Sequence, residues 1–253
     1  MGIFTQSKSA VVAAALVGMS TFANAIPTLQ LGIAGGTYDS DPDIQTIIAP
    51  GSIFSLYGYL IPDATNLITD TYFVSMAVTP KLGPIGANLG SFTVNGATVN
   101  VTADMVYGTP PLDAVLSDKG SLPKHSIFDT YFSETSFSFS AANQSLPFNT
   151  QDTPDSGPQS GAGMYFKKFD IDVTNLSAAY AIHFDLYNSE LITCTKPSCI
   201  PGNFDVTQFA PFSHDAQSGP GDGGVPPNET PEPAPMFLLG LGLLGMAWMR
   251  KKA

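Results

Sequence analysis

Two short stretches late in the chain decide the fold: Phe169-Asp170-Ile171-Asp172-Val173, and Ile182-His183-Phe184-Asp185-Leu186-Tyr187. In both stretches apolar residues alternate with polar ones, which is the period of a β-strand with one apolar face. Asp170 and Asp172 share the polar face of the first strand, and Asp185 lies on the polar face of the second. The alternation therefore predicts two β-strands with acidic outer faces.

The same pattern extends over residues 26–216. Asn95-Gly96 separates two alternating runs and predicts a hairpin, because these residues accept the positive φ angles of a type I′ turn. No stretch holds a helical period over three turns. Short strands between turn signals favour one all-β domain, an antiparallel β-sandwich of jelly-roll or Greek-key type. Further strands are expected at 27–34, 52–61, 71–79, 91–94, 97–101, 135–140, 165–173 and 181–187.

The first 25 residues have the pattern of a cleaved secretory signal. Lys8 is the only charged residue among the first 38, and an apolar run follows from Ser9 to Met19. Ala23-Asn24-Ala25 is the small-x-small pattern that a signal peptidase accepts. We therefore expect a signal helix at 1–25, cleavage after Ala25, and an exported mature protein.

The other end of the chain has three parts in a fixed order. Residues 217–233 are rich in Gly and Pro, which is typical of a linker, and they end in Pro231-Glu232-Pro233. An apolar run then leads to Arg250, Lys251 and Lys252. Its 14 residues from 236 to 249 would span roughly 21 Å as a helix. A bilayer core is about 30 Å thick, so residues 234–253 predict a marginal transmembrane helix with a basic cytoplasmic end.

This three-part order resembles the PEP-CTERM sorting tail of exported bacterial proteins. The resemblance implies an exosortase, an integral-membrane protease that recognises the Pro-Glu-Pro signal. It also implies transient anchoring in the inner membrane with the body outside the cytoplasm, followed by release to the cell envelope or the extracellular matrix. Such proteins accompany exopolysaccharide and biofilm production. A plain carboxy-terminal membrane anchor is the alternative.

The body carries a second resemblance. The two stretches quoted first, together with residues 209–219, are similar to the "choice-of-anchor" domains, which are exported β domains. That resemblance implies no known activity.

Composition excludes one class of partner. Four of the ten basic residues lie in the two end segments, which leaves six against 21 acidic residues, a formal net charge of about −15. The only Arg of the chain is Arg250. An acidic surface without Arg repels nucleic acid, whereas divalent cations, neutral glycans and other proteins remain possible partners.

Two acidic groups are candidate cation sites. Asp39, Asp41 and Asp43 offer alternate oxygen ligands to calcium, although Ile44 and Pro50 break the EF-hand pattern. Asp170, Asp172 and Asp185 would meet on one polar face if their two strands paired, and a bound cation would relieve their repulsion. Solvated turns and faces are the alternative in both cases.

Two cysteines, Cys194 and Cys199, frame a four-residue segment. In an oxidising compartment this spacing predicts a local disulfide, because no other Cys or closely spaced His pair completes a zinc site.

No motif indicates catalysis. Ser160 lacks the first Gly of a nucleophile elbow, His214 and Asp215 are adjacent and should point apart, and Glu134 with Asp129 is an unremarkable carboxylate pair. The sequence therefore predicts a non-enzymatic exported surface or matrix protein. The alternatives are a glycan-binding β-sandwich that recognises extracellular polysaccharide, with or without the help of calcium, and a glycan hydrolase.

Overall fold

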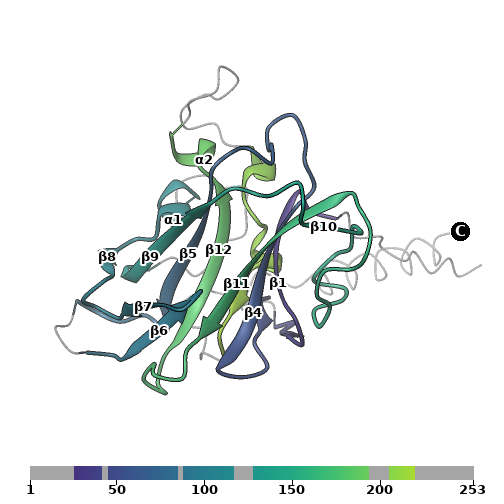
Figure 1. The fold of residues 1–253 in the computed structure, drawn as a ribbon. Coiled ribbons are helices and arrows are strands. Elements are labelled where there is room, and N and C mark those ends of the chain that lie inside the picture. Colours follow the sequence, from purple (N-terminus) through teal and green to yellow (C-terminus); the bar gives the residue numbers. More distant parts are fainter. Residues whose placement is uncertain (1–25, 42–44, 85–87, 117–127, 194–204, 220–253) are drawn as a thin grey trace, which may run out of the picture.

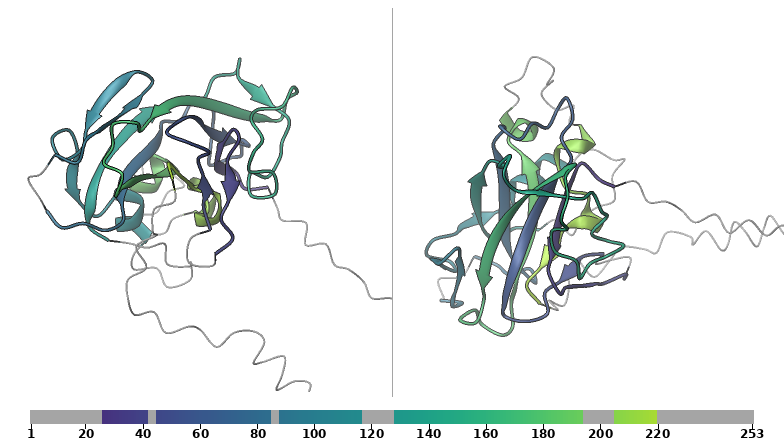
Figure 2. Two further views of the ribbon diagram at one scale, coloured as in Figure 1. Left: turned by 90° about the horizontal axis from the view of Figure 1, so that it is seen from below. Right: turned by 45° about the vertical axis from the view of Figure 1, so that its right-hand side comes forward.

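Two β-sheets pack face to face in a computed structural model of the chain (Figure 1). The structure describes residues 26–41, 45–84, 88–116, 128–193 and 205–219. Two further views show the long strands β4 and β11 running side by side, with the loop that follows β10 beside them (Figure 2). The predicted β-sandwich is confirmed.

Sheet A has the strand order β1-β4-β11-β6-β7, and β10 pairs with β11 at its side. All of its pairs are antiparallel. Its strands are β1 (Leu29–Ile33), β4 (Ile53–Leu60), β6 (Ser91–Val94), β7 (Ala97–Asn100), β10 (Gln144–Ser145) and β11 (Met164–Asp172).

Sheet B has the strand order β2-β3-β13-β12-β5-β9-β8. Its pairs are antiparallel except for β13 with β3, which is parallel. Its strands are β2 (Thr37–Tyr38), β3 (Ile47–Ile48), β5 (Tyr72–Thr79), β8 (Val106–Gly108), β9 (Thr130–Phe137), β12 (Ala181–Asn188) and β13 (Ala216–Gln217). The described helices are short: α1 (Pro111–Leu116), α2 (Glu190–Thr193), and the 3₁₀ turns η1 (Val206–Gln208) and η2 (Phe212–His214).

The predicted strands form close to their expected bounds, and the predicted hairpin connects β6 to β7. Asn95 and Gly96 have φ angles of 51° and 80°, as a type I′ turn requires. The strand expected at 135–140 is displaced to Thr130–Phe137. The two- and three-residue strands were not predicted, because so short a run has no detectable period.

The strands β4, β5, β6, β9, β11 and β12 alternate between the two sheets along the chain. The two stretches that decide the fold, now β11 and β12, therefore belong to opposite sheets of the sandwich instead of pairing. Phe184 of β12 packs edge-on against Phe54 of β4, with ring centroids 6.1 Å apart. Phe137 of β9 meets Phe169 of β11 in the same manner at 5.2 Å. The apolar faces of both stretches thus form one core.

A second, smaller core covers part of the outer face of sheet B. It contains Leu112 of α1, Tyr187 of β12, Leu191 of α2, and Phe209. Helices α1 and α2 lie near each other where β12 ends (Figure 1). This face of β12 is consequently buried rather than solvated, which positions the site described below.

The body extends slightly further than the sequence predicts. Gln217 belongs to β13. Ser218 forms two hydrogen bonds with Ile182: the Ser218 N–H donates to the Ile182 carbonyl at 2.9 Å, and Ser218 Oγ accepts from the Ile182 N–H at 2.8 Å. Gln217 and Ser218, which follow the predicted boundary at residue 216, are thus hydrogen-bonded into sheet B.

Several predictions fall on residues outside the described ranges: the signal segment 1–25, Asp43, the two cysteines and the tail from 220. The helices of the described ranges are all too short or too polar to cross a bilayer.

Gly90 provides a test of this arrangement. Its φ is +94°, and a Cβ atom there would lie 2.1 Å from the carbonyl oxygen of Asn175, at the bridge between Gly90 and Leu176. We expect Gly90→Ala to lower the free energy of unfolding by roughly 2–4 kcal/mol through backbone strain and overpacking. Urea denaturation measures the change.

Gly51→Ala is the matched control, since nothing lies within 4 Å of its added Cβ. A Gly90→Ala protein as stable as Gly51→Ala would contradict the described contact between β6 and residue 175.

Candidate metal centre

Three ionisable side chains converge on the outer face of sheet B. The Nε2 atom of His183 lies 3.3 Å from Oδ1 of Asp185 and 3.4 Å from Oδ2 of Asp215. One ligand atom from each of the three residues lies within 4.8 Å of the other two. One imidazole and two carboxylates in this arrangement form a donor set suited to a divalent cation.

The sheet register explains why these three residues meet. His183 and Asp185 are two residues apart on β12, so they share a face. Strand β13 pairs with β12 through Phe184 and Ala216, and continuing that register places Asp215 opposite Asp185. Asp215 is extended, with φ −85° and ψ −176°, immediately after η2. The turn η2 therefore delivers Asp215 to this position.

Burial leaves the charges of the cluster with little solvation by water. The side chains of Asp185 and Asp215 are each 2% exposed, and that of His183 is 13% exposed. Two carboxylate charges held close together in a poorly solvated site repel each other. A protonated imidazole or a bound cation compensates that repulsion, and the position of His183 between them allows either.

Two buried hydroxyls flank the carboxylates. Ser75 of β5 pairs with Asp185 in the sheet register and shares its face. Thr46 stands beside Asp215, one residue before the pairing of Ile47 with Ala216. Both side-chain oxygens are buried and have no hydrogen-bond partner among the described residues.

Further acidic groups lie along the same face. The Tyr187 hydroxyl donates a hydrogen bond to Glu134 of β9. Burial is the main cause that raises the pKa of Tyr187, and the negative charges of Glu134, Asp185 and Asp113 raise it further. The tyrosine therefore stays a neutral donor among carboxylates.

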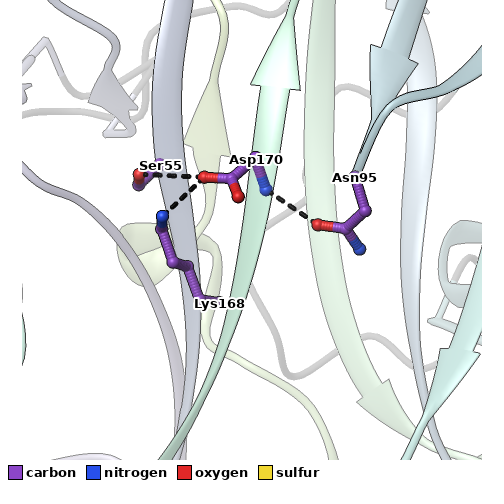
Figure 3. A network of polar contacts seen from close by, with 4 residues as sticks. All are labelled: Ser55, Asn95, Lys168 and Asp170. Atoms are coloured by element: carbon purple, nitrogen blue, oxygen red, sulfur yellow. Dashed lines mark hydrogen bonds and ion pairs between the residues drawn. The ribbon is translucent and has the colours of Figure 1, made fainter.

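The predicted acidic face of Asp170, Asp172 and Asp185 does not form, because β11 and β12 belong to different sheets. Asp170 lies on the exposed outer face of sheet A, where Oδ1 meets Lys168 Nζ at 2.6 Å and accepts from Ser55 Oγ at 3.4 Å (Figure 3). The Asp170 N–H donates to Asn95 Oδ1 at 2.9 Å (Figure 3). A cation is not needed to neutralise Asp170.

The other predicted ligands also have local partners. Asp172 Oδ1 accepts from the N–H of Thr174 at 2.8 Å. Asp39 Oδ1 accepts from the N–H of Asp41 at 3.0 Å, and Asp41 is exposed. The bond between Asp39 and Asp41 forms an Asx-type turn, so the described part of the predicted calcium loop has the structure of a common turn.

The residue pairs weighed for catalysis do not come together. His214 Nε2 meets Asn149 Oδ1 at 2.9 Å and its Nδ1 meets Ser213 Oγ at 2.8 Å, away from Asp215. Burial lowers the pKa of His214 to about 4, against a small opposing effect of Asp152. Asp129 Oδ1 accepts from Thr109 Oγ1 at 2.6 Å, whereas Glu134 binds Tyr187.

The sequence does not predict the cluster, because its three members belong to separate local patterns. The alternation His183-Phe184-Asp185 did signal two polar groups on one face of a strand. Asp215 follows His214 in the sequence, which suggests a pairing of these two neighbours only. Asp215 directly precedes the two-residue strand β13, and so short a sequence does not indicate with which strand β13 pairs.

Residues 229–251 match the PEP-CTERM protein-sorting motif. No curated protein and no solved structure matches the chain. The motif covers the Pro-Glu-Pro signal, the apolar run and two of the three basic residues, so the predicted sorting tail is confirmed.

The contact between His183 and Asp185 predicts energetic coupling. We expect the double variant His183→Ala/Asp185→Ala to lose less free energy of unfolding than the two single variants lose in sum, by at least about 1 kcal/mol. The reason is that, once one of the two side chains is absent, removing the other breaks no further contact between them. Urea unfolding of the four proteins in a chelating buffer measures this coupling.

The control pairs His183→Ala with Asp172→Ala on the other sheet, for which additive changes are expected. Additivity in both cycles would show that His183 and Asp185 do not interact.

Proposed function

We propose that this protein is a non-enzymatic component of the cell surface or extracellular matrix, released from the membrane after exosortase processing. The PEP-CTERM motif at 229–251 carries the proposal, because it marks an exported protein that an exosortase sorts. The β-sandwich ends at about residue 218, shortly before the motif begins. A processed chain would thus release an intact folded body.

The geometry of the described residues supports a role without catalysis. His214 is engaged by Asn149 and Ser213, and the carboxylates of Asp129 and Glu134 have separate partners. None of these pairs forms a nucleophile with an adjacent base or a carboxylate pair across a described cleft. This observation disfavours the glycan hydrolase among the alternatives.

The processing step has a direct test. In the native host, the mass of the mature protein should lack the residues after about Pro233. We expect the triple change Pro231→Ala, Glu232→Ala and Pro233→Ala to leave a full-length tail and to keep the protein in the membrane fraction.

A protein with Pro226→Ala and Pro227→Ala serves as the control, since it changes the linker but keeps the signal. If the native protein retains its tail in the host, the tail is a plain membrane anchor, and the proposed release from the membrane does not occur.

A second candidate function is recognition of extracellular polysaccharide by the outer face of sheet A. Tyr57 and Phe166 are half-buried there, with ring centroids 6.0 Å apart at an angle of 68°. Lys168 pairs with Tyr57 in the sheet register, and Asp170 with Ser55. An aromatic surface beside charged and hydroxyl groups offers stacking to the apolar face of a sugar and hydrogen bonds to its rim.

Substitution of Tyr57 tests this candidate. We expect Tyr57→Ala to weaken binding to the host's own extracellular polysaccharide at least tenfold, whereas Tyr57→Phe should retain most of the affinity because the ring remains. Titrations of the exported protein with calcium and with chelator would also measure the predicted calcium dependence. Absence of saturable binding in either buffer would exclude the glycan-binding role and leave a structural one.

A further inference from the structure

We propose that His183, Asp185 and Asp215 bind one zinc-class divalent cation, which ties strand β13 to strand β12 at the end of the folded body. The proposal concerns a structural metal site and does not depend on the proposed function. It rests on the separation of the donor atoms, on their chemistry and on the buried groups beside them.

The separations fit ligands of one ion better than a direct ion pair. Charge-assisted hydrogen bonds between nitrogen and oxygen are about 2.7–2.9 Å long, whereas His183 Nε2 lies 3.3 Å and 3.4 Å from the two carboxylate oxygens. A zinc ion bound at about 2.0–2.2 Å in a tetrahedral site keeps its ligand atoms about 3.3–3.6 Å apart. The two nitrogen–oxygen separations therefore match edges of such a site, and the two carboxylate ligand atoms lie within 4.8 Å of each other.

The donor types select the class of ion. Calcium and magnesium prefer oxygen ligands throughout, whereas an imidazole nitrogen suits zinc and its transition-metal neighbours. Two carboxylates and one neutral imidazole carry a charge of −2, which a divalent ion neutralises. This matters because the two carboxylates are 2% exposed and thus poorly compensated by water.

The two buried hydroxyls provide an independent observation. Ser75 Oγ and Thr46 Oγ1 have no partner among the described residues, although burying an unpaired hydroxyl is costly. Each lies on the face of the cluster, beside Asp185 and beside Asp215 respectively. Neither hydroxyl bonds a carboxylate in the described part of the structure; once an ion holds the carboxylates, each hydroxyl is placed to donate to its neighbour, as groups behind metal ligands do.

The ion would have a defined mechanical role. Strand β13 is two residues long and is held by two paired residues on β12 and two on β3. Two ligands come from β12 and the third precedes β13 directly. A shared ion would cross-link the last described strand to the central strand of sheet B.

Metal titration of the exported protein, purified from the host and stripped with a chelator, tests the proposal. We expect one zinc ion per chain and a rise of the thermal midpoint by about 5–10 °C in excess zinc, because a ligand that binds only the native state stabilises it. Calcium at the same concentration should produce no comparable rise. X-ray absorption at the zinc edge should show nitrogen and oxygen ligands without sulfur.

Variants locate the ion. His183→Gln and Asp215→Asn keep the side-chain size, and each should weaken zinc binding at least tenfold while the circular dichroism spectrum stays native. Asp172→Asn on sheet A is the matched control and should bind zinc like the unchanged protein. Should a variant fail to fold, the stoichiometry and ligand shell of the unchanged protein still decide the question.

Three outcomes would overturn the proposal: no zinc bound at millimolar concentration, equal affinity in His183→Gln and the unchanged protein, or sulfur in the ligand shell. The first would assign the cluster to a protonated histidine between two carboxylates. The other two would place the ion elsewhere in the chain.

Discussion

Strand β12 is buried on both faces, and the arrangement of the sandwich depends on this constraint. Its inner face contributes Phe184 to the core between the sheets, and its outer face contributes Tyr187 to the smaller core beneath α1 and α2. A strand in this position cannot expose its polar side chains to water. His183 and Asp185 must therefore find polar or ionic partners inside the protein, and the chain supplies Asp215 from η2 and β13 for that purpose.

Local sequence patterns account for the features that the sequence predicts correctly. The alternation in β11 and β12 identifies two strands and their apolar faces correctly, because this period is a local property of the chain. The Asn95-Gly96 turn is equally local, and its positive φ angles confirm the hairpin. The short strands β2, β3 and β13 depend on neighbours that are distant in the sequence, so they were not foreseen.

Local sequence patterns do not predict which aspartates of the two strands are buried. By sequence, the aspartates of β11 and β12 look alike. In the structure Asp170 is exposed and paired with Lys168, whereas Asp185 is buried beside His183. The core formed by α1, α2, Tyr187 and Phe209 covers part of the outer face of sheet B, whereas Asp170 lies on an exposed part of the outer face of sheet A. That covering depends on packing between distant segments, and no periodicity within either strand reports it.

The position of the cluster relative to the sorting motif gives the cross-link its significance. The linker continues directly from β13, so any pull exerted through a membrane-held tail reaches the body first at this strand. Four paired residues hold β13, two on each side, and so short a ladder opens at little cost compared with the eight-residue pairing of β12 with β5. A bond that joins residue 215 to β12 transfers the load to the central strand of sheet B, which is anchored in both cores. The two-residue strand β13 is thereby coupled to the central strand of its sheet, at the point where the folded body meets its tether.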